Sequence, residues 1–212
     1  MANDIVKFFG TQQPISKGLI DQLKGFAAGK QALSGKALLK LNKTGTWTFG
    51  QGNTPVRKGA KLILNPASMS SGFVAWNKSK IEGEVMQPIS LGPVDHGKLH
   101  PVESKTGWQN QVSVELMTQD EIPVQMLYKS SSMGGQDVFF DLAGQLVFAL
   151  SEDPRRVYPV VELGTSSYQH EEFGTVYKPT IAILGWLDAD GAEVLEQGKL
   201  GAAGQSAKRG LV

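Results

Sequence analysis

The spacing of hydrophobic residues predicts a helix near the start of the chain, followed by a series of short strands. Across residues 15–28, apolar side chains recur every three or four positions, as in an amphipathic helix with Ser16 as its N-cap. The period then changes to two. Alternating runs at residues 37–41, 45–49, 61–64, 72–76 and 80–86 predict five strands, because Gly, Asn, Pro and Ser separate them.

The second half of the chain predicts two pairs of strands with a helix between them. Residues 112–116 and 124–128 alternate on either side of a polar turn, which is typical of a hairpin. Residues 136–150 keep a helical spacing that Asp153-Pro154 ends. Residues 158–163 and 177–187 are strongly apolar and predict paired core strands, with residues 164–174 as a polar loop between them. Residues 87–107 lack periodicity and predict a long surface loop.

This succession of elements predicts a mainly β protein, an extended β-barrel of the oligonucleotide-binding (OB) type with two α-helices. We expect one domain over residues 1–188 and a flexible tail over residues 189–212, which are rich in Gly and Ala. The 25 Gly and 10 Pro among 212 residues favour turns over long helices. The absence of cysteine excludes disulfides and thiolate metal sites, and no apolar run predicts a membrane partner.

Charge is distributed unevenly, although the formal net charge is only +1. Residues 1–80 hold twelve Lys or Arg and two acidic residues, which gives +10, whereas the remainder holds nine and eighteen, which gives −9. A basic half of this kind favours a polyanionic partner. A homo-oligomer in which the basic half of one subunit meets the acidic half of the next is also consistent with this polarity.

Aromatic residues lie among the lysines of the basic half, and single-stranded nucleic acid is bound by rings that stack on bases and cations that follow phosphates. Trp47 and Phe49 share one face of a predicted strand, and Trp76 lies beside a basic turn. The opposing interpretation is that these rings belong to the core. The candidate nucleic-acid-binding residues are Lys40, Lys43, Trp47, Phe49, Arg57, Lys58, Lys61, Phe73, Trp76, Lys78, Lys80 and Lys129.

Lys129 begins a stretch of small residues, Ser130 to Gly135, that leads directly into the second predicted helix. Backbone N–H groups at such a place can hold an anion, although a serine that caps the helix explains the same residues. The stretch is not a Walker A loop, because the lysine precedes the glycines.

Residues with catalytic potential are few. Asp95, His96 and His100 lie in a predicted loop, which gives no regular spacing for a metal site. Glu82 and Glu84 alternate along a strand, as acidic metal ligands of nucleases do, but no third carboxylate or lysine accompanies them in a recognisable pattern. We therefore expect a protein that is not an enzyme and needs no cofactor.

Four segments carry a resemblance to known proteins: Asn65-Pro66, residues 71–76, residues 160–163 and residues 173–179. Over about residues 45–187 the chain resembles tailed-phage proteins that are similar to single-stranded DNA-binding proteins of OB fold. The resemblance implies a role in DNA replication or recombination, phage replication proteins as partners, and the cytoplasm of an infected bacterial host as the location. The chain departs from such proteins at its end, where Lys208, Arg209 and apolar residues replace the usual acidic tip.

The sequence thus predicts sequence-independent binding of single-stranded DNA. The alternatives are a phage structural or assembly protein that oligomerises through its opposite charges, and a metal-dependent nuclease that uses Glu82 and Glu84.

Overall fold

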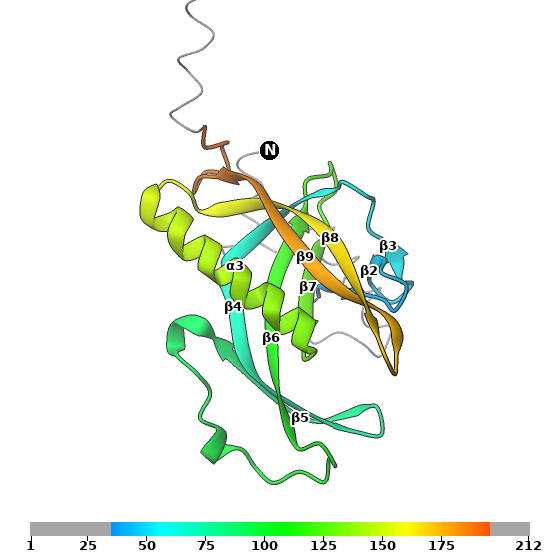
Figure 1. Ribbon diagram of the computed structural model, residues 1–212. Helices are drawn as coiled ribbons and strands as arrows, with labels where there is room; N and C mark the ends of the chain where they lie inside the picture. Colours follow the sequence, from blue (N-terminus) through cyan, green and yellow to red (C-terminus); the bar gives the residue numbers. More distant parts are fainter. Residues whose placement is uncertain (1–34, 196–212) are drawn as a thin grey trace, which may run out of the picture.

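The computed structural model describes residues 35–195, in which nine strands form one curled sheet and one α-helix crosses its inner face (Figure 1). The helix expected at residues 15–28 lies outside the described residues. The strands are β1 (Ala37–Leu41), β2 (Trp47–Phe49), β3 (Thr54–Pro55), β4 (Lys61–Asn77), β5 (Lys80–Pro88), β6 (Trp108–Thr118), β7 (Gln125–Ser130), β8 (Tyr158–His170) and β9 (Gly174–Leu187), and the α-helix is α3 (Met133–Glu152).

The strand order β3-β2-β1-β7-β6-β4-β8-β9 curls the sheet so that its two ends approach each other. The indole Nε1 of Trp47 on β2 donates a hydrogen bond to the Gly164 carbonyl oxygen on β8 at 2.8 Å. Nearby, the Thr165 hydroxyl donates to the Gly45 carbonyl oxygen at 3.1 Å. The predicted mainly β fold is confirmed. The sheet forms a curled half-barrel, and the described residues contain one of the two expected helices.

Strand β4 unites two segments that the sequence analysis predicts as separate strands. Its first part pairs with β6 and β8, and its second part pairs with β6 and β5. Between them the register shifts, since Asn65 faces Glu115 but Ser70 faces Ser113. The Ser68 hydroxyl fills the gap by accepting from the Glu115 backbone N–H at 2.9 Å. The residues that predict a turn therefore form a bulge, which bends one long strand without ending it.

Helix α3 lies across the inner face of the sheet and confirms the predicted helix, with a few more residues at each end (Figure 1). It begins where the Ser132 hydroxyl accepts a hydrogen bond from the Gly135 backbone N–H at 3.2 Å. It ends at Glu152, with Asp153 as its C-cap just before Pro154. Val138, Phe139, Leu142, Leu146 and Ala149 face the sheet and complete the main core.

Buried side chains fill both faces of the sheet where β4 begins. Leu62 and Leu64 join the main core under α3, whereas Ile63 packs on the opposite face with Met117, Val160 and Leu187. Residues 62–64 are therefore apolar in succession and do not alternate as expected, because both faces of the sheet are covered here.

The predicted pairing of β6 with β7 and of β8 with β9 is confirmed, but the polar loop expected at residues 164–174 is wrong. The β8–β9 ladder continues without a break to the pair His170 and Gly174. The polar composition of this segment has a simple cause. It extends past Glu162, the last β8 residue that pairs with β4, so neither of its faces needs to be apolar.

The remaining predictions concern the long loop and the tail. The segment between β5 and β6 is a surface connection with two short 3-10 turns, η1 (Ile89–Leu91) and η2 (His96–Lys98), as expected. The first residues of the expected tail are held to the sheet, because the Val194 backbone N–H donates to the Trp186 carbonyl oxygen at 2.9 Å. Residues 196–212 lie outside the described part. Within residues 35–195, no helix has the length and apolar character needed to cross a membrane.

Candidate nucleic-acid interface

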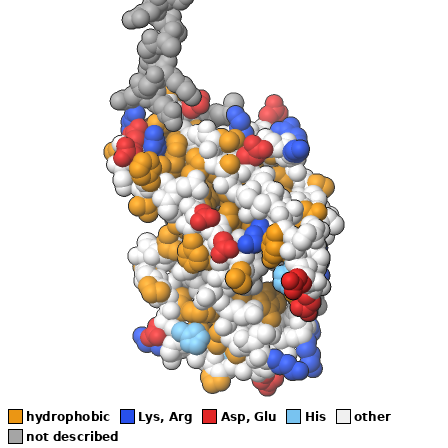
Figure 2. Space-filling view, in the orientation of Figure 1, with side chains coloured by type: hydrophobic (Ala, Val, Ile, Leu, Met, Phe, Trp, Pro, Cys, Tyr) orange, Lys and Arg blue, Asp and Glu red, His pale blue; other side chains and the backbone are white. Residues whose placement is uncertain are grey.

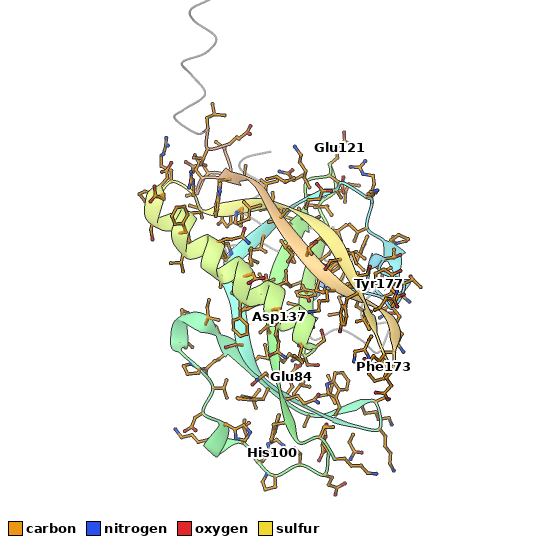
Figure 3. The ribbon with its side chains drawn as sticks, in the orientation of Figure 1. Glu84, His100, Glu121, Asp137, Phe173 and Tyr177 are labelled. Carbon is orange, nitrogen blue, oxygen red and sulfur yellow. The ribbon has the colours of Figure 1, made fainter. Side chains whose placement is uncertain are left out.

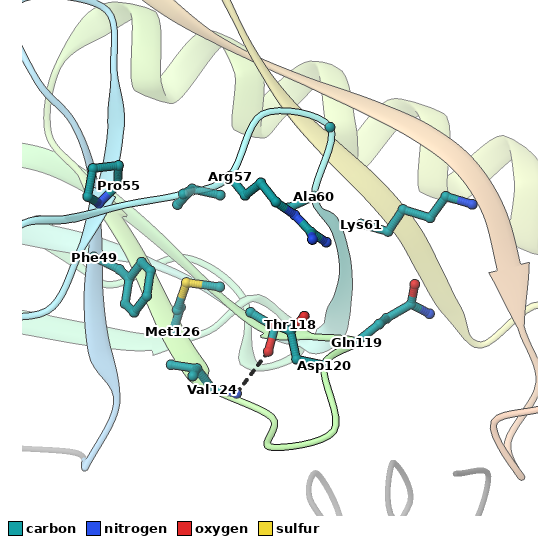
Figure 4. A pocket seen from close by; sticks show the side chains of 12 residues that line it. Phe49, Pro55, Arg57, Ala60, Lys61, Thr118, Gln119, Asp120, Val124 and Met126 are labelled. Atoms are coloured by element: carbon teal, nitrogen blue, oxygen red, sulfur yellow. Dashed lines mark hydrogen bonds between the residues drawn. The ribbon is translucent and has the colours of Figure 1, made fainter.

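A pocket of about 540 Å³ lies between the β3–β4 connection (residues 56–60) and the β6–β7 turn (residues 119–124) (Figure 4). Three of the candidate residues predicted from the sequence line it: Phe49, Arg57 and Lys61. Lys58 belongs to the same connection and is exposed beside them. The pocket is within the size range of small-molecule sites in proteins.

The floor of this pocket is apolar and continuous with the main core. Met126 is fully buried in that core, and Phe49, Val56 and Val124 pack against it while still lining the pocket. Because these side chains rest on packed strands, the Phe49 ring has a firm support. The flat face of a nucleobase can lie against it.

Two tight turns hold the polar edge of the pocket. In the β3–β4 connection, the Ala60 backbone N–H donates to the Arg57 carbonyl oxygen at 3.0 Å, and Gly59 takes the left-handed conformation (φ +73°) that closes this turn. In the β6–β7 turn, the Val124 backbone N–H donates to the Thr118 hydroxyl at 3.0 Å (Figure 4). These bonds hold the backbone in place on both sides of the pocket.

The charges at the pocket are mostly positive. The Arg57 side chain extends into the space between the two turns, and Lys61 lies at the rim (Figure 4). Both are exposed, and neither makes an ion pair with any residue between 35 and 195, including the acidic lining residue Asp120. Two cations beside a supported ring form a site that can hold a phosphate and a base together.

Trp47 is a core residue, and its predicted role as a stacking ring is wrong. The register of β1 and β2 places Trp47 and Phe49 on the same face, as expected, but that face is the inner one. Only 5% of Trp47 is exposed, and its ring makes an edge contact with Tyr128 at 5.5 Å between centroids. Burial raises the pKa of the Tyr128 phenol, and its hydrogen bond with Ser130 acts in the opposite direction.

Lys129 is also occupied within the fold. Its ammonium group donates to both carboxylate oxygens of Glu84 at 3.0 Å, and both side chains are about one quarter exposed. Gln111 donates to the same carboxylate at 2.6 Å. Because Ser132 caps α3, the capping explanation of the small-residue stretch is confirmed. Lys129 is thus a structural ion-pair partner of Glu84 and is not available as an unpaired phosphate contact.

The remaining candidate residues lie away from the pocket. Lys40 pairs with Thr48 and Phe49 pairs with Leu39, so Lys40 and Phe49 are on opposite faces of the sheet. Lys43 is exposed in the turn between β1 and β2. The predicted cations therefore fall into separate groups, and Figure 2 shows basic side chains at several separate places on the face it displays.

Trp76, Lys78 and Lys80 lie at the other end of β4 from Lys61, at the tip of the β4–β5 hairpin. At about 3.3 Å per residue, the length of β4 corresponds to on the order of 50 Å of strand. Trp76 is 38% exposed opposite Ile81, so part of its ring is open to solvent, and its contact with nucleic acid stays a prediction. Phe73, nearer the bulge, is contacted edge-on by the His96 ring at 5.1 Å.

Sequence reasoning misses two parts of the surface. The β6–β7 turn contributes Asp120 and Val124 to the pocket and the start of β7 contributes Met126, but only the fold brings these residues beside the β3–β4 connection. The exposed rings of Tyr168 and Phe173 fall within the predicted loop, although the spacing of Tyr168 and His170 already fits one face of a strand.

The geometry of residues 35–195 also bears on the catalytic alternatives. Glu84 is held by Lys129 and Gln111, and Glu82 accepts a hydrogen bond from the Glu103 backbone N–H. Within these residues, no three His, Asp or Glu side chains gather as a set of metal ligands would.

No family model, curated protein or solved structure matches the chain.

Proposed function

We propose that this protein binds single-stranded DNA without sequence preference and without catalysing a reaction. The observation that carries the proposal is the pocket in which Phe49 offers an aromatic wall and Arg57 and Lys61 offer cations not paired to any described acidic residue. One nucleotide would occupy it, with its base on Phe49 and its phosphate on the cations.

The physical properties of such a site determine how it binds. Every base has a flat face, so stacking on Phe49 tolerates any sequence. Each phosphate that is neutralised releases counterions, so the affinity falls as salt rises. Duplex DNA keeps its bases stacked on each other and cannot place one against the ring.

The resemblance of Asn65-Pro66 and of residues 71–76, 160–163 and 173–179 to tailed-phage proteins similar to single-stranded DNA-binding proteins supports a role in phage DNA replication or recombination. The curled, mainly β sheet is compatible with an OB-like barrel, which is a common support for single-stranded nucleic acid. On this proposal the protein acts in the cytoplasm of the infected bacterial host, together with phage replication proteins.

Fluorescence anisotropy with a labelled oligothymidine and with a duplex of equal length tests the proposal. We expect the single strand to bind at least tenfold more tightly, because only its bases can stack on Phe49. A double variant, Arg57→Gln with Lys61→Gln, should lower the slope of log affinity against log salt by about 0.7 for each phosphate that it no longer neutralises.

The matched control is Lys98→Gln with Lys105→Gln, which removes the same charge from exposed positions outside the pocket. It should leave the slope nearly unchanged. Equal affinity for single strand and duplex, or equal slopes in the two double variants, would contradict the proposal.

A second candidate, an assembly protein, is favoured by the outer face of α3. Four large apolar side chains there are at least 63% exposed: Met133, Phe140, Val147 and Phe148. Figure 2 shows hydrophobic side chains at the surface in the region of α3. Light scattering without DNA should then show association that rises with concentration and that Phe148→Ser prevents. Association that salt alone reverses would favour contact through opposite charges.

A further inference from the structure

Past Glu162, where its pairing with β4 stops, the β8–β9 hairpin continues as a two-stranded arm, residues 164–180 (Figure 1). Strand β4 accompanies β8 only at Val160, Val161 and Glu162, whereas the pairing of β8 with β9 runs on to His170 and Gly174. In Figure 3, Phe173 lies at the end of this arm and Tyr177 lies farther back along β9.

One face of the arm presents three rings in succession, here called the ring row: Tyr168, His170 and Phe173. Tyr168 and His170 are two residues apart on β8 and so share a face, and Phe173 lies in the turn that follows. The ring centroids of Tyr168 and His170 are 6.4 Å apart, and those of His170 and Phe173 are 4.7 Å apart.

The ring row is both exposed and held in place. Tyr168 is 43% exposed and Phe173 is 68% exposed, although large aromatic side chains usually bury most of their surface. The Nδ1 atom of His170 accepts hydrogen bonds from the backbone N–H groups of Glu172 at 3.1 Å and Phe173 at 3.3 Å. These bonds fix the central ring against the turn, so little ordering is required when a ligand binds.

A cation lies next to the ring row. The Lys178 ammonium nitrogen is 5.1 Å from the centroid of the Tyr168 ring, and it lies 3.8 Å from the Asp137 carboxylate at the beginning of α3. The Lys178–Asp137 pair is exposed and loosely spaced, so it leaves most of the charge of Lys178 available to solvent.

The other face of the arm packs against the body of the protein. Tyr177, which pairs with Ser167, packs its ring against Gly45 in the β1–β2 turn. The arm is therefore braced on the Tyr177 face, while the ring row faces away from that contact.

We propose that the ring row is a second contact for single-stranded DNA, in which bases stack on Phe173 and Tyr168 and a phosphate binds Lys178. This inference rests on the proposed function and extends it to a separate part of the molecule. Glu171 and Glu172 in the turn repel phosphates, so the DNA backbone passes on the Lys178 side of the rings. The arm and the pocket then hold different nucleotides of one strand.

Single-ring variants test the arm, measured by anisotropy with oligothymidine. Phe173→Leu keeps an apolar side chain but removes the ring, and it should weaken binding on the order of tenfold. Phe173→Tyr keeps a ring and should bind oligothymidine as tightly as the original protein does. The matched control is Phe140→Leu on α3, which changes an equally exposed phenylalanine outside both proposed contacts and should leave the affinity unchanged.

Substitutions of the charged residues on the arm give an independent test, because removing a positive and a negative charge should change the DNA affinity in opposite directions. Lys178→Gln should weaken binding and lower the salt slope by about 0.7. Glu171→Gln with Glu172→Gln should strengthen binding, because the repulsion of the phosphates is removed. A mere loss of folding cannot produce this opposite pair of results.

The outcomes separate the two proposals. If the original protein prefers the single strand but Phe173→Leu and Phe140→Leu bind equally well, the arm is not a contact and the proposed function stands. If the original protein fails to prefer the single strand, the proposed function is overturned and the arm proposal with it.

Discussion

The inner face of β2 and the arm present nearly the same residue pattern to different surroundings. In β2, Trp47 alternates with threonines, and in the arm Tyr168 and His170 alternate with Ser167 and Gln169. Trp47 is 5% exposed, because β7 and α3 contribute to the core that surrounds it, whereas Tyr168 is 43% exposed on a ladder that extends beyond that core. Alternation determines which side chains share a face. What that face meets depends on the rest of the fold.

Trp47→Ala should have the largest effect and tests whether Trp47 and the arm differ in their contribution to stability. It removes a buried ring and the hydrogen bond to Gly164, so the free energy of unfolding should fall by about 3–5 kcal/mol. Phe173→Leu on the arm should change it by less than about 0.5 kcal/mol. Urea denaturation of both variants measures the difference, and similar decreases would show that the arm also belongs to the core.

Gly45→Ala tests the contact that braces the arm. Gly45 has a φ of +78°, and an added Cβ would lie 2.5 Å from the Tyr177 ring. Gly50→Ala is the control, because Gly50 has a φ of +71° and no neighbouring atoms within 4 Å. The left-handed backbone costs about 1–2 kcal/mol in both variants. We expect roughly 1 kcal/mol more for Gly45→Ala in thermal or urea unfolding. Equal destabilisation would mean that the ring moves aside without cost.

Lys129 and Arg57 are cations in different surroundings. Lys129 forms an ion pair with Glu84 within the fold, whereas Arg57 is exposed at the surface. Lys129→Met removes a partly exposed ion pair with Glu84, so it should lower the free energy of unfolding by about 1 kcal/mol and leave DNA affinity unchanged. Arg57→Gln should leave the free energy of unfolding unchanged and weaken DNA binding. A double-mutant cycle with Glu84→Gln isolates the ion-pair energy, and weaker DNA binding by Lys129→Met would restore Lys129 as a contact.

Asp153→Asn should have the smallest effect, at the end of α3. Hydrogen bonds from the Arg155 side chain and backbone lower the pKa of the Asp153 carboxyl to about 2, below its ordinary value of 3.8. The depressed pKa means that the carboxylate stabilises the fold above about pH 4 and loses this effect as the pH falls towards 2. The small stability difference between the original protein and the variant should therefore vanish over that interval. A difference that persists at pH 2 would contradict this assignment.

The sequence predicts the local elements well because each depends on nearby residues. Strand β1, the helical pattern of α3 and both later strand pairs follow from periodicity. The sequence alone does not distinguish the bulge at Asn65 and Pro66 from a turn, because the same residue types occur in both. Only the pairing with β6 shows which one forms. The pocket shows the same limit: the sequence identifies Phe49, Arg57 and Lys61 singly, but the opposing wall comes from a turn about sixty residues later.

Photo-crosslinking with an oligomer containing 5-iododeoxyuridine tests the central claim most directly. Because the reaction favours aromatic side chains in contact with the base, the attached peptides identify which exposed rings bind DNA. We predict crosslinks at Phe49 and at Tyr168 or Phe173, and none at Phe140 or Phe148 on the outer face of α3. Crosslinks confined to α3, or none at a saturating concentration of the single strand, would contradict the account.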